Sequence, residues 1–399
     1  MKQVLNIAIF EMNQIFKDKL LALMVFAVPL LYAVIFGIVY VSAVLTNVPV
    51  GIVDLDHSGL SREVADAFAN DPRFKIIPEI GSYAQLEEGM KNGTVRAGVV
   101  IPEAFATDVA MHRPTEVMTV YDASNLIWGF NIRRYTLEVV NKFSADHAAA
   151  YLAGLGLSTR ENYNTLNTVS CNIEVLYNPT YSYATFMIMG LFLLIIHQLC
   201  LLCVSLTVTR EKDRNTWIQY LAAAVPAWKI FLGKSLPYFF ASLFNYGLLI
   251  WFAVHLVHIK VEGPASLVLA LGLVFILIIT SIGFYLSVRA ANSLQITRLV
   301  MLLSVPFFFI SGYIWPKTHI PAVINGLATL LPYNWMAAAM RLVTLKNVGL
   351  KDVQLPTLIL CAMAAISVLL AATFSKRVKP PEDDGPVVNG GTYTPRKMD

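Results

Sequence analysis

Charged residues are scarce in this sequence. Asp, Glu, Lys and Arg make up 14% of the 399 residues, against 56% hydrophobic residues, and the mean hydropathy is +0.60. This composition excludes an ordinary soluble domain and indicates a membrane protein. The net charge of +4 is small, and no basic stripe is interleaved with aromatic residues, so we expect no nucleic-acid binding.

Cysteine is also rare, with four in the chain. Cys171 stands alone between the first two apolar runs and Cys361 lies in the last run, so we expect no intrachain disulfide framework. A bridge between Cys171 of two copies stays open. His197, Cys200 and Cys203 recur every three residues and share one helical face. Three ligands on one helix fan too widely for a closed tetrahedral site, so we expect no metal.

The sequence lacks a nucleotide-binding loop and a convincing nucleophile–base pair. Gly233-Lys234-Ser235 imitates the end of a P-loop, but Trp228 stands where that motif needs a glycine. The chain is therefore expected to bind no cofactor, and a membrane enzyme is the least favoured function. The central parts of the apolar runs also lack Asp, Glu, Lys and Arg, which ion and proton pathways usually require.

Six apolar runs are long enough to cross a bilayer as helices, which needs roughly 20 residues each. They are Leu20 to Leu45, Tyr183 to Thr209, Ile230 to Val257, Leu267 to Val288, Leu299 to Ile314 and Pro356 to Phe374. The fifth is short and carries Pro306. The region 315–345 is interrupted by Pro321, Gly326 and Pro332, which predicts a re-entrant or interfacial hairpin, because broken backbone at membrane depth must be covered by protein or a cavity.

Lys and Arg in short loops mark the cytoplasmic side of a membrane. Four basic clusters fall on one side of the predicted spans: Lys17 and Lys19; Arg210, Lys212 and Arg214; Arg289 and Arg298; Lys376, Arg377 and Lys379. Both termini are therefore predicted to be cytoplasmic. Four basic residues deviate and fall on the outer side: Lys317, Arg341, Lys346 and Lys351. We give the majority more weight, because the deviant charges lie in or beside the predicted hairpin.

Residues 1–45 are expected to form an interfacial elbow helix followed by the first span. Apolar residues from Val4 to Phe16 recur at helical spacing, with polar residues opposite. The first apolar run is longer than the core of a signal peptide, so we do not expect cleavage. Residues 181–379 hold the other spans, and residues 380–399, rich in Pro, Gly and Asp, are predicted to be disordered.

Residues 46–180 differ from the rest of the chain in their sequence pattern, because short β-branched runs alternate with helical segments. This pattern predicts an extracytoplasmic α/β domain with at least partly parallel strands. The predicted strands are Val48 to Asp54, Phe74 to Ile77, Ala97 to Ile101, Val117 to Tyr121 and Val169 to Leu176. The predicted helices are Ser58 to Ala69, Ser82 to Asn92, Pro102 to His112 and Asn131 to Leu152. Polar residues follow strand ends at Asp54, Asp56, Asp122 and Ser124; we favour turn and capping roles over ligand binding. Asn92-Gly93-Thr94 is likewise interpreted as a turn.

The segment Arg210-Glu-Lys-Asp-Arg-Asn-Thr-Trp217 follows the second span and is the most informative part of the chain. From Trp217 to Trp228 the apolar residues recur at helical spacing, which predicts one amphipathic helix over 210–228. Such a helix rests its apolar stripe on the membrane and presents its charged end to a protein. An ordinary interfacial helix that only anchors its neighbours is the alternative.

This segment, together with Leu176-Tyr-Asn-Pro179, Gly233-Lys234 and Ser311-Gly-Tyr-Ile-Trp-Pro316, resembles the permease subunit of an ABC-2 type exporter, of the type V kind. The order of motifs agrees from the first span to about Lys379. In that family a Glu-rich segment containing Gly-Thr forms the coupling helix that seats in the ATPase. Here Asn215 replaces the usual glycine, which predicts a stiffer turn.

The resemblance implies a helical membrane protein with six transmembrane helices, a re-entrant hairpin and an inserted α/β domain. It implies the permease of an ATP-driven exporter in the bacterial inner membrane, with ATP and Mg²⁺ held by a separate cytoplasmic ATPase. A second permease copy or close relative and membrane lipids are the other expected partners, and a periplasmic adaptor stays open. The expected coupling residues are Arg210, Glu211, Lys212, Asp213, Arg214, Thr216 and Trp217.

The fifth span is expected to break and turn back near an outer exit gate, formed by Pro306, Phe307, Phe308, Phe309, Ser311, Gly312 and Pro316. Lipid-facing packing of the three phenylalanines is the alternative. The lack of charge within the spans favours an apolar or amphipathic cargo, such as a drug or lipid. A membrane receptor or assembly scaffold, whose outer domain binds a partner, is the competing function.

Overall fold

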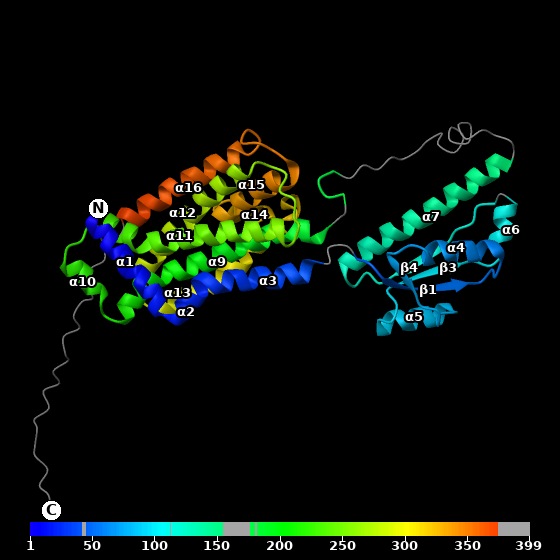
Figure 1. Ribbon diagram of the computed structural model, residues 1–399, viewed down its shortest axis with the longest axis horizontal. Coiled ribbons are helices and arrows are strands. Elements are labelled where there is room, and N and C mark those ends of the chain that lie inside the picture. Colours follow the sequence, from blue (N-terminus) through cyan, green and yellow to red (C-terminus); the bar gives the residue numbers. More distant parts are fainter. Residues whose placement is uncertain (42–44, 112, 155–175, 180–181, 374–399) are drawn as a thin grey trace, which may run out of the picture. The chain divides into compact units, whose positions relative to one another are not determined.

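The structure is a computed structural model that describes residues 1–41, 45–111, 113–154, 176–179 and 182–373 (Figure 1). The chain forms two compact units, one of Met1–Val41 with Ser182–Asp399 and one of Ser42–Tyr181. The strand predicted over Val169 to Leu176 falls outside the described residues except for Leu176, as do Cys171 and the predicted disordered tail over 380–399.

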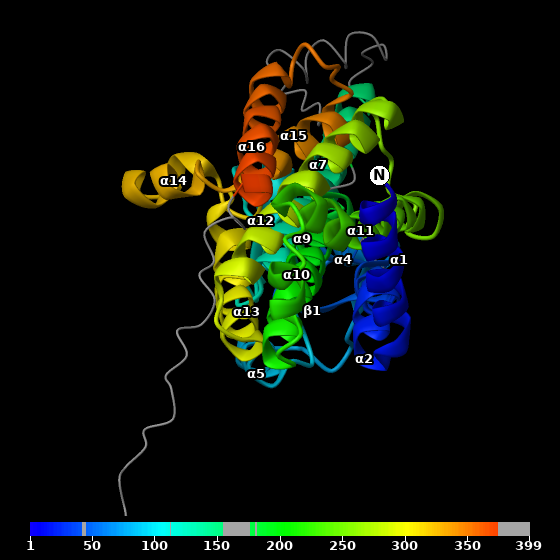
Figure 2. The same cartoon turned by 90° about the vertical axis from the view of Figure 1, so that its left-hand side faces the viewer.

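Six helices among the described residues are long and apolar enough to cross a membrane, as predicted. They cover Lys19–Tyr40, which combines α2 (Lys19–Ala22), the π-helical η1 (Leu23–Ala27) and most of α3 (Val28–Val41), then α9 (Tyr183–Asp213), α11 (Ala227–His255), α12 (Ala265–Arg289), α13 (Ser293–Ile310) and α16 (Gln354–Thr373). Helix α9 is the central one: it packs against α3, α11, α12, α13 and α15 (Figure 2).

The predicted N-terminal helix is α1 (Lys2–Lys17). It packs along α11, and the Asp18 side chain caps the helix that follows by accepting the Leu21 N–H at 3.1 Å. Only Val4, Glu11 and Ile15 of α1 are buried, while the apolar side chains of Leu5, Ile9 and Phe16 are exposed. The apolar stripe of α1 therefore points mostly away from the protein, as suits an interfacial helix.

The fifth span was predicted with the wrong limits. Helix α13 begins at Ser293, six residues before the predicted Leu299, and ends at Ile310 rather than Ile314. The Asn292 side chain caps its start by accepting the Gln295 N–H at 2.8 Å. Pro306 lies inside the helix without ending it. The helix ends instead just before Gly312, whose φ of +76° is open to glycine and strained for other residues.

The region 315–345 folds as the short 3₁₀ turn η2 (Lys317–His319), α14 (Ala322–Ala328) and α15 (Pro332–Lys346). Pro321 and Pro332 begin the two helices, but Gly326 lies within α14, so the predicted break there was wrong. Helix α15 packs against α9, α12, α13 and α16. Helix α14 projects from the bundle with exposed apolar side chains (Figure 2).

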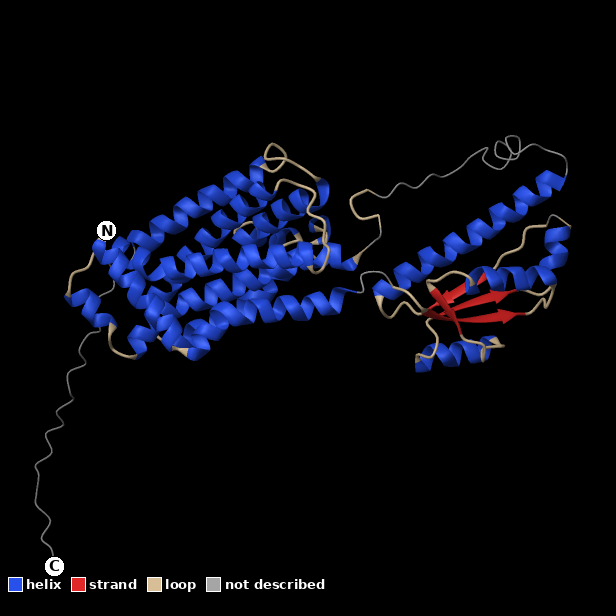
Figure 3. Cartoon of the chain, viewed as in Figure 1, coloured by secondary structure: helices blue, strands red, loops and turns tan. Residues whose placement is uncertain are grey.

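The second unit is an α/β fold with strand order β2-β1-β3-β4 (Figure 3). The strands are β1 (Val48–Asp54), β2 (Phe74–Ile76), β3 (Ala97–Ile101) and β4 (Met118–Tyr121), which confirms four predicted strands. Strand β1 pairs in parallel with β2 and β3, and β4 is antiparallel to β3. The partly parallel sheet was therefore correctly predicted.

Helices cover both faces of this sheet. One face packs against α4 (Gly59–Ala69) and α7 (Leu126–Gly154), burying Phe68, Ile132 and Tyr135 against the strands. The other packs against α5 (Tyr83–Asn92) through Leu86. Helix α6 (Phe105–Ala110) is shorter than predicted, and α7 begins five residues before the predicted Asn131. There the Asn125 side chain accepts the Ile127 N–H at 2.9 Å and so starts the helix.

Candidate coupling site

The segment 210–228 is not the single helix that its periodicity predicts. Residues 210–213 are the last turn of α9, α10 spans only Trp217–Ala222, and α11 starts at Ala227. The chain reverses between α9 and α10 at Asn215, with φ of +56°, and again at Ala224, with φ of +46°. Asparagine is one of the few residues that tolerate this left-handed backbone, so Asn215 can make this turn in place of the glycine that the resemblance implies.

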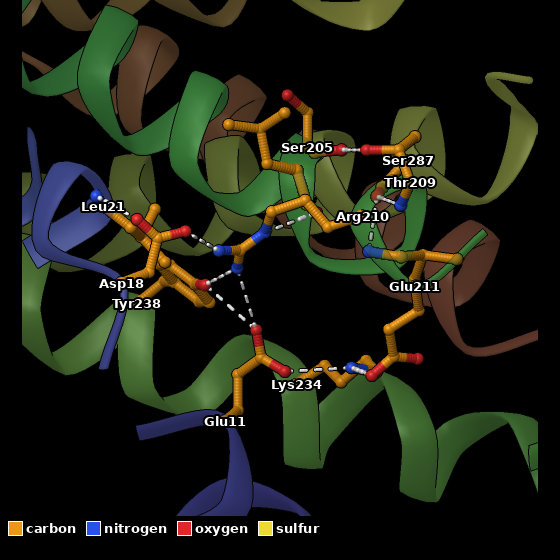
Figure 4. A network of polar contacts seen from close by, with 12 residues as sticks. Glu11, Asp18, Leu21, Ser205, Thr209, Arg210, Glu211, Lys234, Tyr238 and Ser287 are labelled. Atoms are coloured by element: carbon orange, nitrogen blue, oxygen red, sulfur yellow. Dashed lines mark hydrogen bonds and ion pairs between the residues drawn. The ribbon is translucent and has the colours of Figure 1, made fainter. Parts of the chain in front are cut away.

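The last turn of α9 carries two of the predicted coupling residues into a buried polar cluster, which we define as Glu11, Asp18, Arg210, Glu211, Lys234 and Tyr238 (Figure 4). The Arg210 guanidinium lies 3.3 Å from Asp18 Oδ2 and 3.6 Å from Glu11 Oε1. It also donates to the Tyr238 hydroxyl at 3.0 Å, and this hydroxyl donates to Glu11 Oε1 at 3.0 Å. Arg210 therefore joins α9 to α1 and α11.

Lys234 completes the polar cluster. Its ammonium group is fully buried and lies 2.6 Å from Glu211 Oε1 and 2.9 Å from Glu11 Oε2 (Figure 4). Charges buried to this degree are stable only when they are paired. The preceding Gly233 lets α1 approach closely, because a Cβ there would lie 2.6 Å from the Cβ of Ile7. Gly233 and Lys234 are therefore used in contacts between helices. The sequence around them lacks a complete P-loop motif, so no nucleotide-binding role was predicted for them.

The roles of Glu11 and Lys234 were not predicted from the sequence. One signal for Glu11 was present: it lies seven residues after Val4 and four before Ile15, so the three share one face of α1. A carboxylate buried among apolar residues on one helical face needs a cation buried beside it. No periodicity within α1 identifies that cation, because Lys234 is 223 residues away in the sequence.

Lys212 and Asp213 hold the connection between α12 and α13. The Lys212 ammonium donates to the carbonyl oxygens of Val288 and Ala290 at 2.6 and 2.7 Å, where α12 ends. A cation at this position satisfies carbonyls that lack helical partners. Asp213 Oδ2 accepts the Ser293 N–H at 3.2 Å, at the start of α13. Two further predicted coupling residues therefore bind a neighbouring loop of the same chain.

The remaining coupling residues lie on or beside α10. Arg214 is exposed, and Thr216 is partly buried and donates through its N–H to the Glu211 carbonyl at 2.8 Å. Trp217 is buried and packs against Tyr220 with ring centroids 5.8 Å apart. Ile218, and Trp228 at the start of α11, are large apolar side chains on the surface of this region, 52% and 45% exposed. A cavity of about 470 Å³ separates α10 from α1.

The predicted gate residues lie together, but they do not form one surface. Phe308 is buried and packs against Tyr313 and Tyr333, with ring centroids 6.3 and 6.0 Å away. Phe309 is exposed and Phe307 is partly buried. Ser311 stabilises the turn, since its hydroxyl donates to the Phe308 carbonyl at 2.6 Å and accepts the Tyr313 N–H at 3.2 Å. Pro316 precedes η2.

The polar residues at the strand ends of the second unit form turns and caps, the roles that the sequence favoured over ligand binding. Asp54 accepts the Ser61 hydroxyl at 2.7 Å and the N–H groups of Asp56 and His57 at 3.0 Å each. Burial acts to raise the pKa of Asp54, but these hydrogen bonds outweigh it and the pKa is lowered. Asp56 accepts the Ala106 N–H at 3.1 Å.

Asp122 and Asn92 are likewise used locally. Hydrogen bonds from the Ser124 hydroxyl and N–H, and then from Arg96, lower the pKa of Asp122. The Asn92 side chain accepts the N–H of Thr94 at 3.0 Å beside Gly93, which confirms the predicted turn.

His197, Cys200 and Cys203 are all buried in the bundle. The His197 ring packs against Phe275 and Tyr333, and Cys200 Sγ lies 3.5 Å from the Thr280 hydroxyl. Within the described part of the chain, no three His, Cys, Asp or Glu side chains gather closely enough to hold a metal ion. These contacts are those of packing residues.

The described residues form a bundle with six helices long and apolar enough to cross a membrane, preceded by the amphipathic helix α1. The match to the family described as ABC-2 family transporter protein covers residues 19–373. The chain belongs to this family, whose members are membrane subunits that work with a separate ATPase.

Three relatives illustrate the likeness. The inner membrane transport permease YhhJ of Escherichia coli (strain K12) is 24% identical over 363 residues, covering 88% of this chain and 91% of its own. The probable multidrug ABC transporter permease YbhR of the same strain is 21% identical, covering 76% of this chain and 80% of its own. The linearmycin resistance permease protein LnrN of Bacillus subtilis (strain 168) is 23% identical, covering 92% of this chain and 97% of its own.

Proposed function

We propose that this chain is the permease of an ATP-driven exporter that moves a hydrophobic or amphipathic molecule out across the bacterial inner membrane. The observation that carries the mechanism is the polar cluster, which fixes the last turn of α9 to α1 and α11. Lys212 and Asp213 fix the same turn to the α12–α13 connection. A displacement of α10 by an ATPase would therefore reach four helices at once.

The proposed cargo class is supported by the spans and by the relatives. The central parts of the six spans carry no Asp, Glu, Lys or Arg, which disfavours an ion or proton pathway. Two relatives are named for multidrug transport and for linearmycin resistance. ATP and Mg²⁺ would be held by the partner ATPase, and a second permease copy would complete the transporter. Stimulation of a purified partner ATPase by cargo distinguishes this function from a receptor or scaffold.

We propose that the ATPase contact lies on the exposed surface of α10 and the start of α11. Reversing the charge of Glu211 would break the ion pair with Lys234 and so disturb the fold. The exposed Ile218 and Trp228 are better probes. Replacing both by Glu should reduce co-purification with the ATPase at least about tenfold, because a buried apolar contact of this size contributes a few kcal/mol.

The matched control is Leu350→Glu, which alters an exposed apolar residue in the loop before α16. It should leave ATPase association unchanged. Equal association of the wild type and the Ile218→Glu/Trp228→Glu variant, with both stably inserted, would show that α10 and the start of α11 do not face the ATPase.

The orientation of the chain is tested by cysteine labelling in a background without the four native cysteines. A cysteine at Ser82, exposed at the start of α5, should react with a membrane-impermeant reagent from outside the cell. A cysteine at Asp213 should react only after the membrane is opened, because the basic clusters predict that the end of α9 is cytoplasmic. The reverse pattern would overturn the proposed topology.

A further inference from the structure

Two cations lie near the N-terminal end of α9, far from the polar cluster. The Arg341 guanidinium on α15 lies over the rings of Tyr313 and Phe186, at 4.2 and 4.9 Å from their centroids. It donates to the Tyr313 carbonyl. Phe186 stands 24 residues before Arg210 on α9, which at 1.5 Å per residue is about 36 Å along the helix.

Lys317, in η2, is the second cation. Its aliphatic chain lies over Gly312, and its ammonium group lies 5.8 Å from the centre of the Trp335 ring. Burial, and then the positive charge of Arg341, lower the pKa of Lys317. The two cations are therefore close enough to repel one another.

No carboxylate neutralises this pair among the described residues, since neither side chain takes part in an ion pair there. The buried Arg341 Nε also has no hydrogen-bond partner in this part of the chain. Two partly desolvated like charges held together are unfavourable without a counter-charge. The contrast with the polar cluster, where each cation has a carboxylate, points to an anion supplied from outside the chain.

The surface beside the pair is apolar. Helix α14 follows η2 directly, and Val323, Leu327 and Leu330 on and after it are 78%, 57% and 71% exposed. A molecule that places an anionic group on Lys317 would lay an attached hydrocarbon chain against these side chains. A free anion would gain nothing from them.

We propose that Lys317 and Arg341 bind the phosphate group of an anionic amphiphile, with α14 covering its hydrocarbon chain. The site takes a phospholipid headgroup in preference to inorganic phosphate. It also accounts for two of the basic residues that deviate from the charge asymmetry of the loops, because these cations serve a ligand instead of marking the cytoplasmic side. The proposal does not depend on the direction of transport.

The test uses the purified full-length chain in neutral detergent, with lipid binding followed by native mass spectrometry. Dioleoyl phosphatidylglycerol should bind about tenfold more tightly than dioleoyl phosphatidylcholine, as expected for a charge-assisted contact. Lys317→Gln should abolish this preference for phosphatidylglycerol, and Lys317→Glu should make the chain bind phosphatidylcholine more tightly than phosphatidylglycerol. Lys317 lies in the short turn η2 and is only partly buried, and its replacement leaves the contacts of Arg341 with Tyr313 and Phe186 in place, so we expect both variants to fold.

Lys351→Gln is the matched control, since Lys351 is an exposed lysine in the loop before α16, and it should retain the preference. If millimolar inorganic phosphate displaces the lipid, and this displacement depends on Lys317, the site binds free phosphate. If the lipid stays bound, the result supports recognition of a phospholipid headgroup. Equal binding of the two lipids by the wild type, or an undiminished preference in both Lys317 variants, would overturn the proposal.

Discussion

Replacing Lys234 by Met is expected to destabilise the membrane unit by about 3–5 kcal/mol, the usual cost of removing one partner of a buried ion pair. The side chain of Lys234 is fully buried, and those of Glu11 and Glu211 are only 3% and 13% exposed. The Glu211 carboxylate would lose its nearest cation, and the Glu11 carboxylate would keep only the Arg210 guanidinium, 3.6 Å away. The midpoint of thermal unfolding in detergent should fall sharply, and α1 should become accessible to protease.

Two further variants separate charge from packing. Lys229→Met removes a lysine of the same helix whose ammonium group bonds to Gln3 at an exposed position, and it should have little effect. The combination of Lys234→Met with Glu11→Gln and Glu211→Gln should recover much of the lost stability, because neutral side chains need no buried counter-charge. A Lys234→Met protein as stable as the wild type would show that the polar cluster does not hold α1 in place.

Replacing Gly312 by Val is expected to reduce transport strongly while leaving ATPase association intact. Gly312 has φ of +76°, where a residue with a side chain costs on the order of 1–2 kcal/mol and a β-branched residue costs more. A Cβ there would also lie 2.4 Å from Lys317 Cγ, so the turn after α13 has to move. Export of a fluorescent amphiphile from vesicles holding the permease and its ATPase measures the loss.

Gly326→Val is the control for this experiment. Gly326 lies within α14 and no atom lies within 4 Å of where its Cβ would be, so this variant should transport normally. ATPase association should survive in both variants because the polar cluster lies at the other end of α9. Normal export by a stably inserted Gly312→Val protein would remove this turn from the proposed gate and would favour lipid-facing packing for Phe307 and Phe309.

Secondary structure was predictable wherever one face or one run of residues is uniformly apolar. The strands β1 and β3 are short β-branched runs between turn residues, and both were placed correctly. The errors occurred where the same local sequence pattern is compatible with two different structures. Pro306, Ser311-Gly312 and Pro316 were together expected to break the fifth helix, yet α13 continues through Pro306 and ends only at Ile310, before Gly312. The segment predicted as one helix over 210–228 contains two left-handed residues, Asn215 and Ala224.

The candidate site was likewise predicted only in part. The segment 210–217 was correctly singled out as the most charged stretch between two spans, but its residues were all assigned to an external partner. In the structure Arg210 and Glu211 bind α1 and α11, and Lys212 and Asp213 bind the α12–α13 connection. Charge and periodicity indicate that a residue needs a partner, and they do not indicate which one.

The sequence by itself determined the membrane class, the six apolar helices, the α/β unit and the family, because these follow from composition, period and the order of motifs. Tertiary structure alone decided that Glu11 meets Lys234 across 223 residues and that Lys317 and Arg341 lie together without a carboxylate among the described residues. The physical reason is that hydrophobic burial depends on local pattern, whereas a buried charge is stabilised only by whichever group the fold brings within a few ångströms.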